Sequence, residues 1–224
     1  MDVTISGAAS DNLGTSVSTG DMNADGKIDL IAGAPTASCA GVGSVYIFYN
    51  DGEYPASASS ANVTITGEVG STCLGTALSV GDFNADGTVD LAASTSRYST
   101  NTGRVYIFHN DGSIPTTAAT ADVTITGNAT SDFFGDALTS GDLNGDGETD
   151  LIVGAYGYNP GGAADTGRTY IFHNDGSIPT TAATADVTIT GAAASDKFGK
   201  SLVTGELNAD SKTDLAIGAI GHST

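Results

Sequence analysis

Short segments rich in valine, isoleucine, threonine, tyrosine and phenylalanine recur along the chain, each bounded by glycine, asparagine or aspartate. This pattern predicts short β-strands joined by tight turns. One unit contains a strand that opens on Phe-Gly or Leu-Gly, an acidic loop, a DLIVGA-like strand, a variable loop, a VYIF-like strand, an Asn-Asp-Gly turn and a DVTITG strand. No segment keeps a 3.6-residue period for long enough to predict a helix.

The units are internal repeats of the sequence. Residues 106–127 are identical to residues 170–191, and the acidic loops open at Asp21, Asp82, Asp142 and Glu206, in steps of 61, 60 and 64 residues. Four antiparallel strands in each unit of about 60 residues are typical of a β-propeller blade. The sequence therefore predicts one all-β domain over residues 1–224, a propeller of about four blades with four-stranded antiparallel sheets. The units fall at about 7–67, 68–127, 128–191 and, in part, 192–224.

The two ends of the chain fit this scheme incompletely. Residues 3–6 have the sequence of a last-type strand, and the fourth unit contains only its first two strands, which gives fifteen strands in all and an incomplete last blade. We expect residues 3–6 to pair with a terminal blade of the same chain or of a neighbouring copy. Open blade edges would otherwise expose unpaired backbone, so a homo-oligomer formed through these edges is a further expectation.

The acidic loops are the strongest candidates for function. Oxygen-bearing side chains stand at loop positions 1, 3, 5 and 9, glycine at position 6 permits a sharp bend in three of the loops, and position 7 can offer its carbonyl. An all-oxygen donor set suits Ca²⁺ and offers neither thiolate nor imidazole to zinc. The candidate ligands are Asp21, Asn23, Asp25, Lys27, Asp29; Asp82, Asn84, Asp86, Thr88, Asp90; Asp142, Asn144, Asp146, Glu148, Asp150; and Glu206, Asn208, Asp210, Lys212, Asp214, with positions 7 contributing their carbonyls. The alternative is an ordinary Asx-rich hairpin turn.

The charge of the chain agrees with bound cations. Its formal net charge is −19, with 26 acidic against 7 basic residues. This balance argues against a nucleic-acid partner, since phosphate binding needs clustered lysine and arginine. No apolar run approaches the roughly 18 residues that predict a membrane span, and no signal peptide is expected directly after Met1. Three or four calcium ions are the predicted cofactors.

The strand-loop-strand pattern resembles the FG-GAP repeat found in the propeller of integrin alpha subunits and in many bacterial surface proteins. The third unit carries Phe134-Gly135, the loop 142–150 and Gly154-Ala155 in the matching places; the others carry Leu13-Gly14 with Gly33-Ala34-Pro35, Leu74-Gly75 with Ala93-Ser94, and Phe198-Gly199 with Gly218-Ala219. The resemblance implies one Ca²⁺ between the first two strands of each blade and an extracellular binding role. The fourth loop departs from it, with Glu206 for aspartate and Ser211 for glycine, and the family commonly has seven blades.

Two further sets of residues are candidates. Strand direction alternates within a blade, so the variable loops and the connections between blades should share the end opposite the acidic loops. This places Cys39 and Cys73, the only cysteines, at that end in adjacent blades and predicts a disulfide, with two unrelated thiols as the alternative. Tyr98, Tyr156 and Tyr158 lie in the variable loops and are candidate contacts for a protein or glycan, or else solvated loop residues.

The leading functional hypothesis is a calcium-stabilised extracellular scaffold that binds a protein or a glycan through the loops opposite the calcium sites. The alternatives are a self-assembling structural protein, whose incomplete blade is completed by another copy, and a lectin-like propeller. We do not expect an enzyme. No nucleophile elbow, HExxH or phosphate-binding loop is present, and the strong acidic pairs all fall inside the loops. His109 and His173 occupy equivalent repeat positions, as structural residues do.

Overall fold

The computed structural model describes residues 3–39, 41–69, 73–162 and 164–221. Three four-stranded antiparallel sheets and one two-stranded sheet form four successive blades, each with its strands in sequence order. The first blade contains β1 (Ser16–Gly20), β2 (Asp29–Ala34), β3 (Ser44–Phe48) and β4 (Val63–Thr66); the second β5 (Leu78–Gly81), β6 (Asp90–Thr95), β7 (Arg104–Phe108) and β8 (Val123–Thr126); the third β9 (Ala137–Gly141), β10 (Asp150–Ala155), β11 (Arg168–Phe172) and β12 (Val187–Thr190); and the fourth β13 (Phe198–Gly205) and β14 (Asp214–Ala219).

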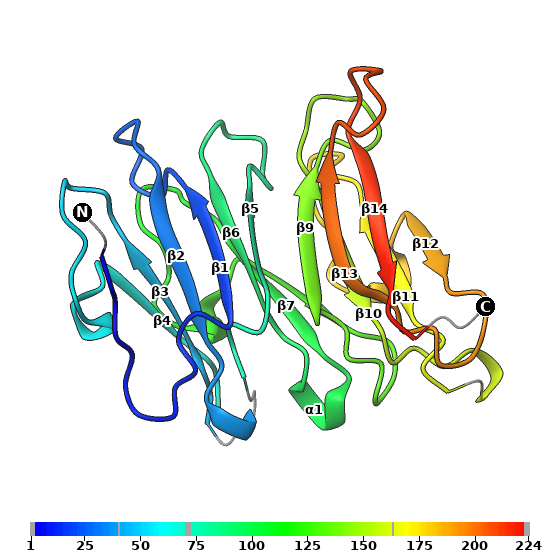
Figure 1. Ribbon diagram of the computed structural model, residues 1–224. Helices are drawn as coiled ribbons and strands as arrows, with labels where there is room; N and C mark the ends of the chain where they lie inside the picture. Colours follow the sequence, from blue (N-terminus) through cyan, green and yellow to red (C-terminus); the bar gives the residue numbers. More distant parts are fainter. Residues whose placement is uncertain (1–2, 40, 70–72, 163, 222–224) are drawn as a thin grey trace.

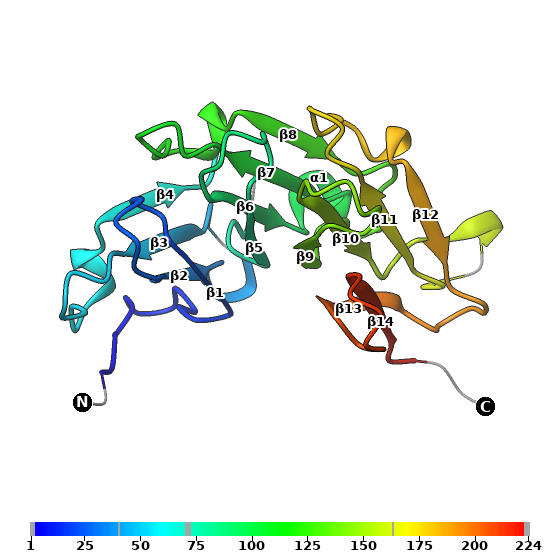
Figure 2. The same cartoon turned by 90° about the horizontal axis from the view of Figure 1, so that it is seen from above.

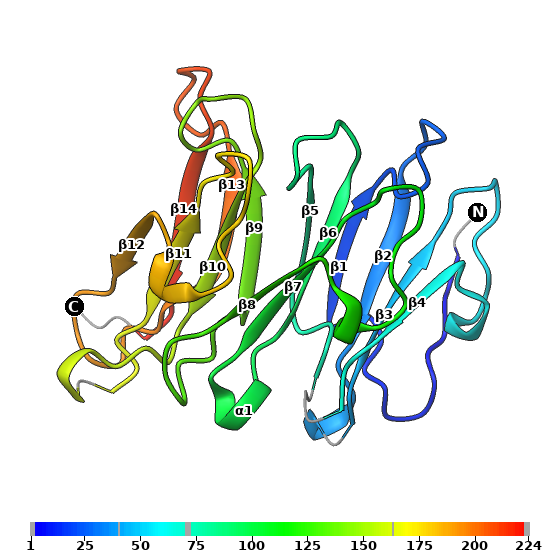
Figure 3. The ribbon, with the colours of Figure 1, turned by 180° about the vertical axis from the view of Figure 1, so that it is seen from behind.

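The blades stand side by side along an arc (Figure 1). Seen from above, the first strands β1, β5, β9 and β13 lie on the concave inner side and contact one another in succession (Figure 2). The last strands β4, β8 and β12 lie on the outside (Figure 3). The sequence-based prediction of an all-β propeller with antiparallel blades and an incomplete last blade is confirmed.

Apolar side chains from adjacent blades form the core. Because successive residues of a strand point to opposite sheet faces, each strand supplies both of its blade's interfaces. Between the first two blades, Ile31 and Ile47 of one pack with Leu91, Tyr106 and Phe108 of the next. The second interface repeats this arrangement with Ala92, Val105, Ile107, Ile125, Phe134, Leu151, Val153, Tyr170 and Phe172. The strand alternation seen in the sequence thus serves blade-on-blade packing.

The variable loop of each blade is joined to the next blade by close backbone contact. Gly43, Gly103 and Gly167 form parallel bridges to Leu74, Phe134 and Phe198. A Cβ at each glycine would collide with the carbonyl oxygen of its bridge partner, and their φ angles of 73°, 83° and 82° are left-handed. Glycine therefore precedes each VYIF-like strand because the next blade passes too near for a side chain.

One expectation about local structure was wrong. Residues 3–6 do not form a strand: Ser6 makes an isolated parallel bridge to Ser57 of the first blade, as Thr66 does to Thr117 and Thr126 to Thr181. Fourteen strands are present in the described residues instead of fifteen. Short helical turns also occur, which the strand pattern did not predict, because they depend on local backbone closure and not on a 3.6-residue period. They are α1 (Tyr98–Asn101) and the 3-10 turns Ala37–Cys39, Ala58–Ser60, Ala118–Thr120, Pro160–Gly162 and Ala182–Thr184.

A disulfide joins Cys39 to Cys73, whose Cα atoms lie 4.9 Å apart. It links the variable loop of the first blade to the connection that enters the second. Both lie at the end of the strands opposite the acidic loops, as strand direction predicts. The bridge closes a segment with a sequence separation of 34, and closure of this length is expected to contribute roughly 2–4 kcal/mol to the free energy of unfolding.

Candidate functional site

The four acidic loops all lie at the same end of the strands, along one edge of the arc. They connect β1 to β2, β5 to β6, β9 to β10 and β13 to β14, where each first strand ends and each second strand begins (Figure 1). We call them the first (residues 21–29), second (82–90), third (142–150) and fourth loop (206–214), and number their positions 1 to 9. Position 6 has φ of 82°, 88° and 94° in the first three loops, which favours glycine, whereas Ser211 holds 66° in the fourth.

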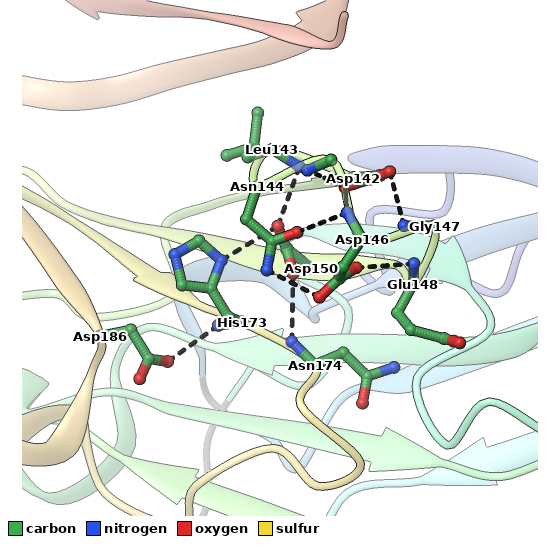
Figure 4. Close-up of polar contacts among 11 residues, drawn as sticks. Asp142, Leu143, Asn144, Asp146, Gly147, Glu148, Asp150, His173, Asn174 and Asp186 are labelled. Carbon is green, nitrogen blue, oxygen red and sulfur yellow. Dashed lines mark hydrogen bonds and ion pairs between the residues drawn. The ribbon is translucent and has the colours of Figure 1, made fainter.

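The side chains at positions 1, 3 and 5 are turned into the loop (Figure 4). In the third loop Asp142 Oδ2 accepts the Gly147 N–H at 2.9 Å, and Asp142 Oδ1 accepts that of Gly145 at 2.6 Å. Asn144 Oδ1 accepts the Asp146 N–H at 2.9 Å, and Asp146 Oδ1 accepts the Glu148 N–H at 2.8 Å. The sequence thus folds as a stack of Asx turns with its oxygens facing inward.

The first and second loops are closed by similar bonds. Asp21 accepts the N–H groups of Asp25 and Gly26 at 3.1 and 2.8 Å, and Asp82 accepts those of Asp86 and Gly87 at the same distances. Hydrogen bonds from the Thr88 hydroxyl, the Thr88 N–H and the Asn84 amide lower the pKa of Asp86 to about 2. The carboxylate at position 5 of the second loop is therefore ionised at neutral pH, as a cation ligand must be.

The aspartate at position 9 is buried. Asp29, Asp90 and Asp150 are each 0% exposed. Asp150 Oδ2 accepts the Leu143 N–H at 2.9 Å and lies 3.1 Å from His173 Nδ1, while its Oδ1 accepts the Asn174 N–H at 3.1 Å. The aspartate thus fastens its loop to the Asn-Asp-Gly turn of the same blade.

This role of position 9 was missed by sequence reasoning, which treated the aspartate only as a cation ligand and the Asn-Asp-Gly segment only as a turn. The bond recurs from Asn50 to Asp29 at 2.8 Å and from Asn110 to Asp90 at 2.8 Å. The one available signal was that each complete unit contains both an aspartate at position 9 and an Asn-Asp-Gly turn, although the two are separated by 21, 20 and 24 residues. Position 9 is accordingly a structural residue as well as a candidate ligand.

The fourth loop differs from the other three. Glu206 Oε1 accepts the N–H groups of Asn208, Ala209 and Asp210, so the longer side chain still closes the turn. Asp214 accepts the Leu207 N–H at 2.8 Å, but its other oxygen accepts the Asn208 side-chain amide at 3.2 Å, and it is only half-buried.

The donor set of the loops fits calcium. Carboxylate and amide oxygens at positions 1, 3, 5 and 9 and the carbonyl at position 7 are hard ligands, and a carboxylate oxygen that accepts one hydrogen bond keeps further lone-pair capacity. In the described part of the chain, no three acidic, histidine or cysteine side chains gather closely enough to hold a metal by themselves. The carboxylates instead point to backbone N–H groups, so cation binding would require them to draw together.

The three candidate tyrosines at the opposite end are half-buried and stacked. The Arg104 guanidinium lies 3.6 Å from the centre of the Tyr98 ring, and that of Arg168 lies 3.7 Å from Tyr158. Tyr156 stacks on Phe133 with ring centres 4.8 Å apart. These tyrosines hold their loops against the blades, and part of each ring stays exposed.

Asp132 lies at the same end, on the connection into the third blade, and is 3% exposed. Its Oδ2 has no hydrogen-bond partner among the described atoms, and burial raises its pKa to about 6. Because the folded pKa lies above the unfolded one, the native state binds the extra proton, and the free energy of unfolding should fall as pH rises from about 4 to about 6.

Asp132→Asn removes this charge and should raise the free energy of unfolding at pH above 6 by about 1–3 kcal/mol, with little effect below pH 4. Denaturant unfolding of both proteins across this range measures the difference, and comparison at each pH cancels the titration of the loops. Asp11→Asn is the matched control. Asp11 accepts the N–H groups of Ala8 and Leu13, so the same change at this position should lower the free energy of unfolding. Equal pH profiles for Asp132→Asn and the unaltered chain would contradict the assignment.

Taken together, the radial sheets and their repeated loops define a repeat-built β-propeller with one acidic nine-residue loop in each blade. A model of the FG-GAP repeat matches residues 13–48, 74–108 and 134–172, and the chain belongs to the FG-GAP repeat family.

Several relatives carry similar repeats. Phosphatidylinositol-glycan-specific phospholipase D of Bos taurus is 35% identical over 179 residues, which cover 74% of this chain and 21% of that protein. Integrin alpha-PS2 of Drosophila melanogaster is 32% identical over 152 residues, covering 65% of this chain and 10% of the integrin. Integrin alpha-IIb of Mus musculus is 34% identical over 157 residues, covering 65% and 15%. The chain thus spans about a fifth or less of these relatives. Among the described residues, no helix has the length and apolar character needed to cross a membrane.

Proposed function

We propose that this chain is a calcium-binding, non-catalytic propeller scaffold outside the cell, which binds a protein or a glycan through the loops opposite its acidic loops. One observation carries the proposal: the two kinds of loop lie at opposite ends of the same strands. The acidic loops repeat closely from blade to blade, while the variable loops differ in length and sequence. A rigid scaffold with variable loops at one end is the usual arrangement of a binding protein.

The distribution of charge supports the same division. Five of the seven basic residues belong to the variable end, namely Arg97, Arg104, Arg168, Lys197 and Lys200. The acidic loops repel one another at the other end unless cations neutralise them. Calcium there would stabilise the scaffold without occupying the binding surface.

The relatives support a binding role over catalysis. Integrin alpha chains and the phospholipases share these repeats, and the region shared with the phospholipases is only about a fifth of their length. The disulfide agrees with an oxidising compartment outside the cell.

Binding of the purified chain to a glycan array and to immobilised extracellular proteins tests the proposal. We expect binding that Tyr98→Ala or Tyr158→Ala weakens by about tenfold, because either substitution removes an aromatic contact and frees the arginine that covers it. Lys27→Ala, a change at the acidic end, is the control and should leave binding unchanged. If only Lys27→Ala weakens binding, the binding surface lies at the acidic end and the proposal is wrong. Binding to sugars alone would favour the lectin-like form.

Self-assembly is a second candidate. The face of the first blade that is turned away from the second blade has an apolar surface, lined by Leu13, Leu30, Ala32, Phe48 and Tyr54. At the other end of the arc, Val203, Leu207 and Ile220 are exposed. Sedimentation that shows a monomer at all concentrations would exclude this candidate and leave the binding scaffold.

A further inference from the structure

Adjacent acidic loops are connected through one buried asparagine. Asn110, from the Asn-Asp-Gly turn of the second blade, donates its backbone N–H to Asp90 Oδ1 of the second loop at 2.8 Å. Its side-chain Nδ2 donates to the Met22 carbonyl of the first loop at 3.1 Å. The same residue therefore contacts position 9 of its own loop and the backbone of the preceding one.

The next pair of loops has a similar connection, to the carbonyl of loop position 1 instead of position 2. Asn174 donates its N–H to Asp150 Oδ1 of the third loop at 3.1 Å, and its Nδ2 donates to the Asp82 carbonyl of the second loop at 3.2 Å. Figure 4 shows Asn174 beneath Asp150 with its side chain directed away from the third loop. Hydrogen bonds thus run without a break from the first loop through Asn110 to the second, and through Asn174 to the third.

Burial makes these links effective. Asn174 is 0% exposed and Asn110 is 7% exposed, so water does not compete readily for their amides. Removing either side chain would leave a loop carbonyl in the blade interface without its donor. A hydrogen bond in such surroundings holds its two partners in a fixed relation.

We propose that Asn110 and Asn174 are positioning residues that couple calcium binding between neighbouring loops. The proposal rests on the calcium binding proposed above. A cation in the first loop would fix the Met22 carbonyl, and through Asn110 would hold Asp90 where the second loop needs its position-9 ligand. The second ion then binds to a loop that is already ordered, which gives positive cooperativity without a change of fold.

The matched control is Asn50, the equivalent residue of the first blade. Its N–H donates to Asp29 in the same way, but among the described residues its side-chain amide meets no neighbouring acidic loop. Asn50→Ala and Asn110→Ala therefore remove the same side chain from the same turn, and they differ only in the inter-blade hydrogen bond.

Calorimetric calcium titration of the full chain tests the coupling. With the third and fourth loops disabled by Asp146→Ala and Asp210→Ala, two sites remain, and we expect the second ion to bind about fivefold more tightly than two independent sites allow, which is the size expected for one hydrogen bond. Asn110→Ala should abolish this cooperativity, whereas Asn50→Ala should preserve it. Loss of overall stability alone would not change the ratio of the two binding constants.

The possible failures are distinguishable. If the unaltered chain binds no calcium, the proposed function is wrong; if it binds calcium at independent sites, or with equal cooperativity in both asparagine variants, only the coupling is wrong. Hydrogen exchange tests the coupling without the asparagine variants, in case Asn110→Ala does not fold. In a chain with only the first loop intact, calcium should slow exchange of the Asn110 amide more than that of Asn174, and equal slowing of the two would also overturn the coupling.

Discussion

Chelation of calcium is expected to lower the melting temperature of this chain by about 15 °C or more. A ligand that binds only the native state stabilises it, by about 2.7 kcal/mol for each site at a concentration one hundred times its dissociation constant. Three or four such sites together far exceed the effect of any single surface contact. In a chain of this length, each kcal/mol shifts the melting temperature by about 2–4 °C. Thermal unfolding followed by circular dichroism, in calcium and in chelator, measures the shift.

Magnesium provides the control for this experiment. It demands near-octahedral geometry and gives up its water reluctantly, so an equal concentration should restore much less of the lost stability than calcium does. A melting curve that is the same in calcium and in chelator would contradict the assignment of the loops. It would leave them as Asx-rich turns.

Substitution of the buried Asp150 is expected to destabilise the chain by about 3–5 kcal/mol even without calcium, and by more in calcium, where one ion would also be lost. Asp150→Ala leaves the N–H groups of Leu143 and Asn174 without their acceptor in a buried position. Loss of charge-assisted hydrogen bonds of this kind lowers the free energy of unfolding strongly. Asp146 of the same loop is exposed. Asp146→Ala should therefore reduce stability by about 2–3 kcal/mol in calcium, through the loss of one ion, and by less than about 1 kcal/mol in chelator.

Denaturant unfolding of the two variants, in calcium and in chelator, separates a structural aspartate from a cation ligand. Asp90→Ala and Asp86→Ala repeat the comparison in the second loop, where the equivalent hydrogen bonds are present. If Asp150→Ala were harmful only in calcium, its hydrogen bonds to the backbone would contribute little, and position 9 would act as a ligand alone.

The blade architecture could be predicted from the sequence because its determinants are local and repeated. Strand-forming segments, the turns between them and the glycine of the Gly-x-VYIF segments recur in each complete unit, and strand direction alone placed Cys39 and Cys73 at one end. The residues proposed as cation ligands likewise followed from spacing within nine residues. Such inferences need no knowledge of how one blade lies on the next.

The remaining features depend on contacts between distant segments. Asn110 and Met22 are 88 positions apart, and nothing near either residue reveals that they meet. The arginine over Tyr98 was equally hidden, because cation–π stacking depends on the path of the variable loop. Residues 3–6 resemble the last strand of a blade in sequence but make only a single bridge. Among the described residues, no VYIF-like strand, the third strand of a blade, lies beside them. Strand propensity without a pairing partner does not produce a strand.

The disulfide gives the arc a direction that its repeats lack. The first two joints between blades are made from the same kinds of apolar faces, and all three joints contain a backbone bridge. Stability is therefore transmitted from neighbour to neighbour, as along a linear chain of coupled units. Only the joint between the first and second blades is also covalent. The joints from the second blade to the third and from the third blade to the fourth carry no such crosslink. Under mechanical load the first two blades should therefore be the last to separate.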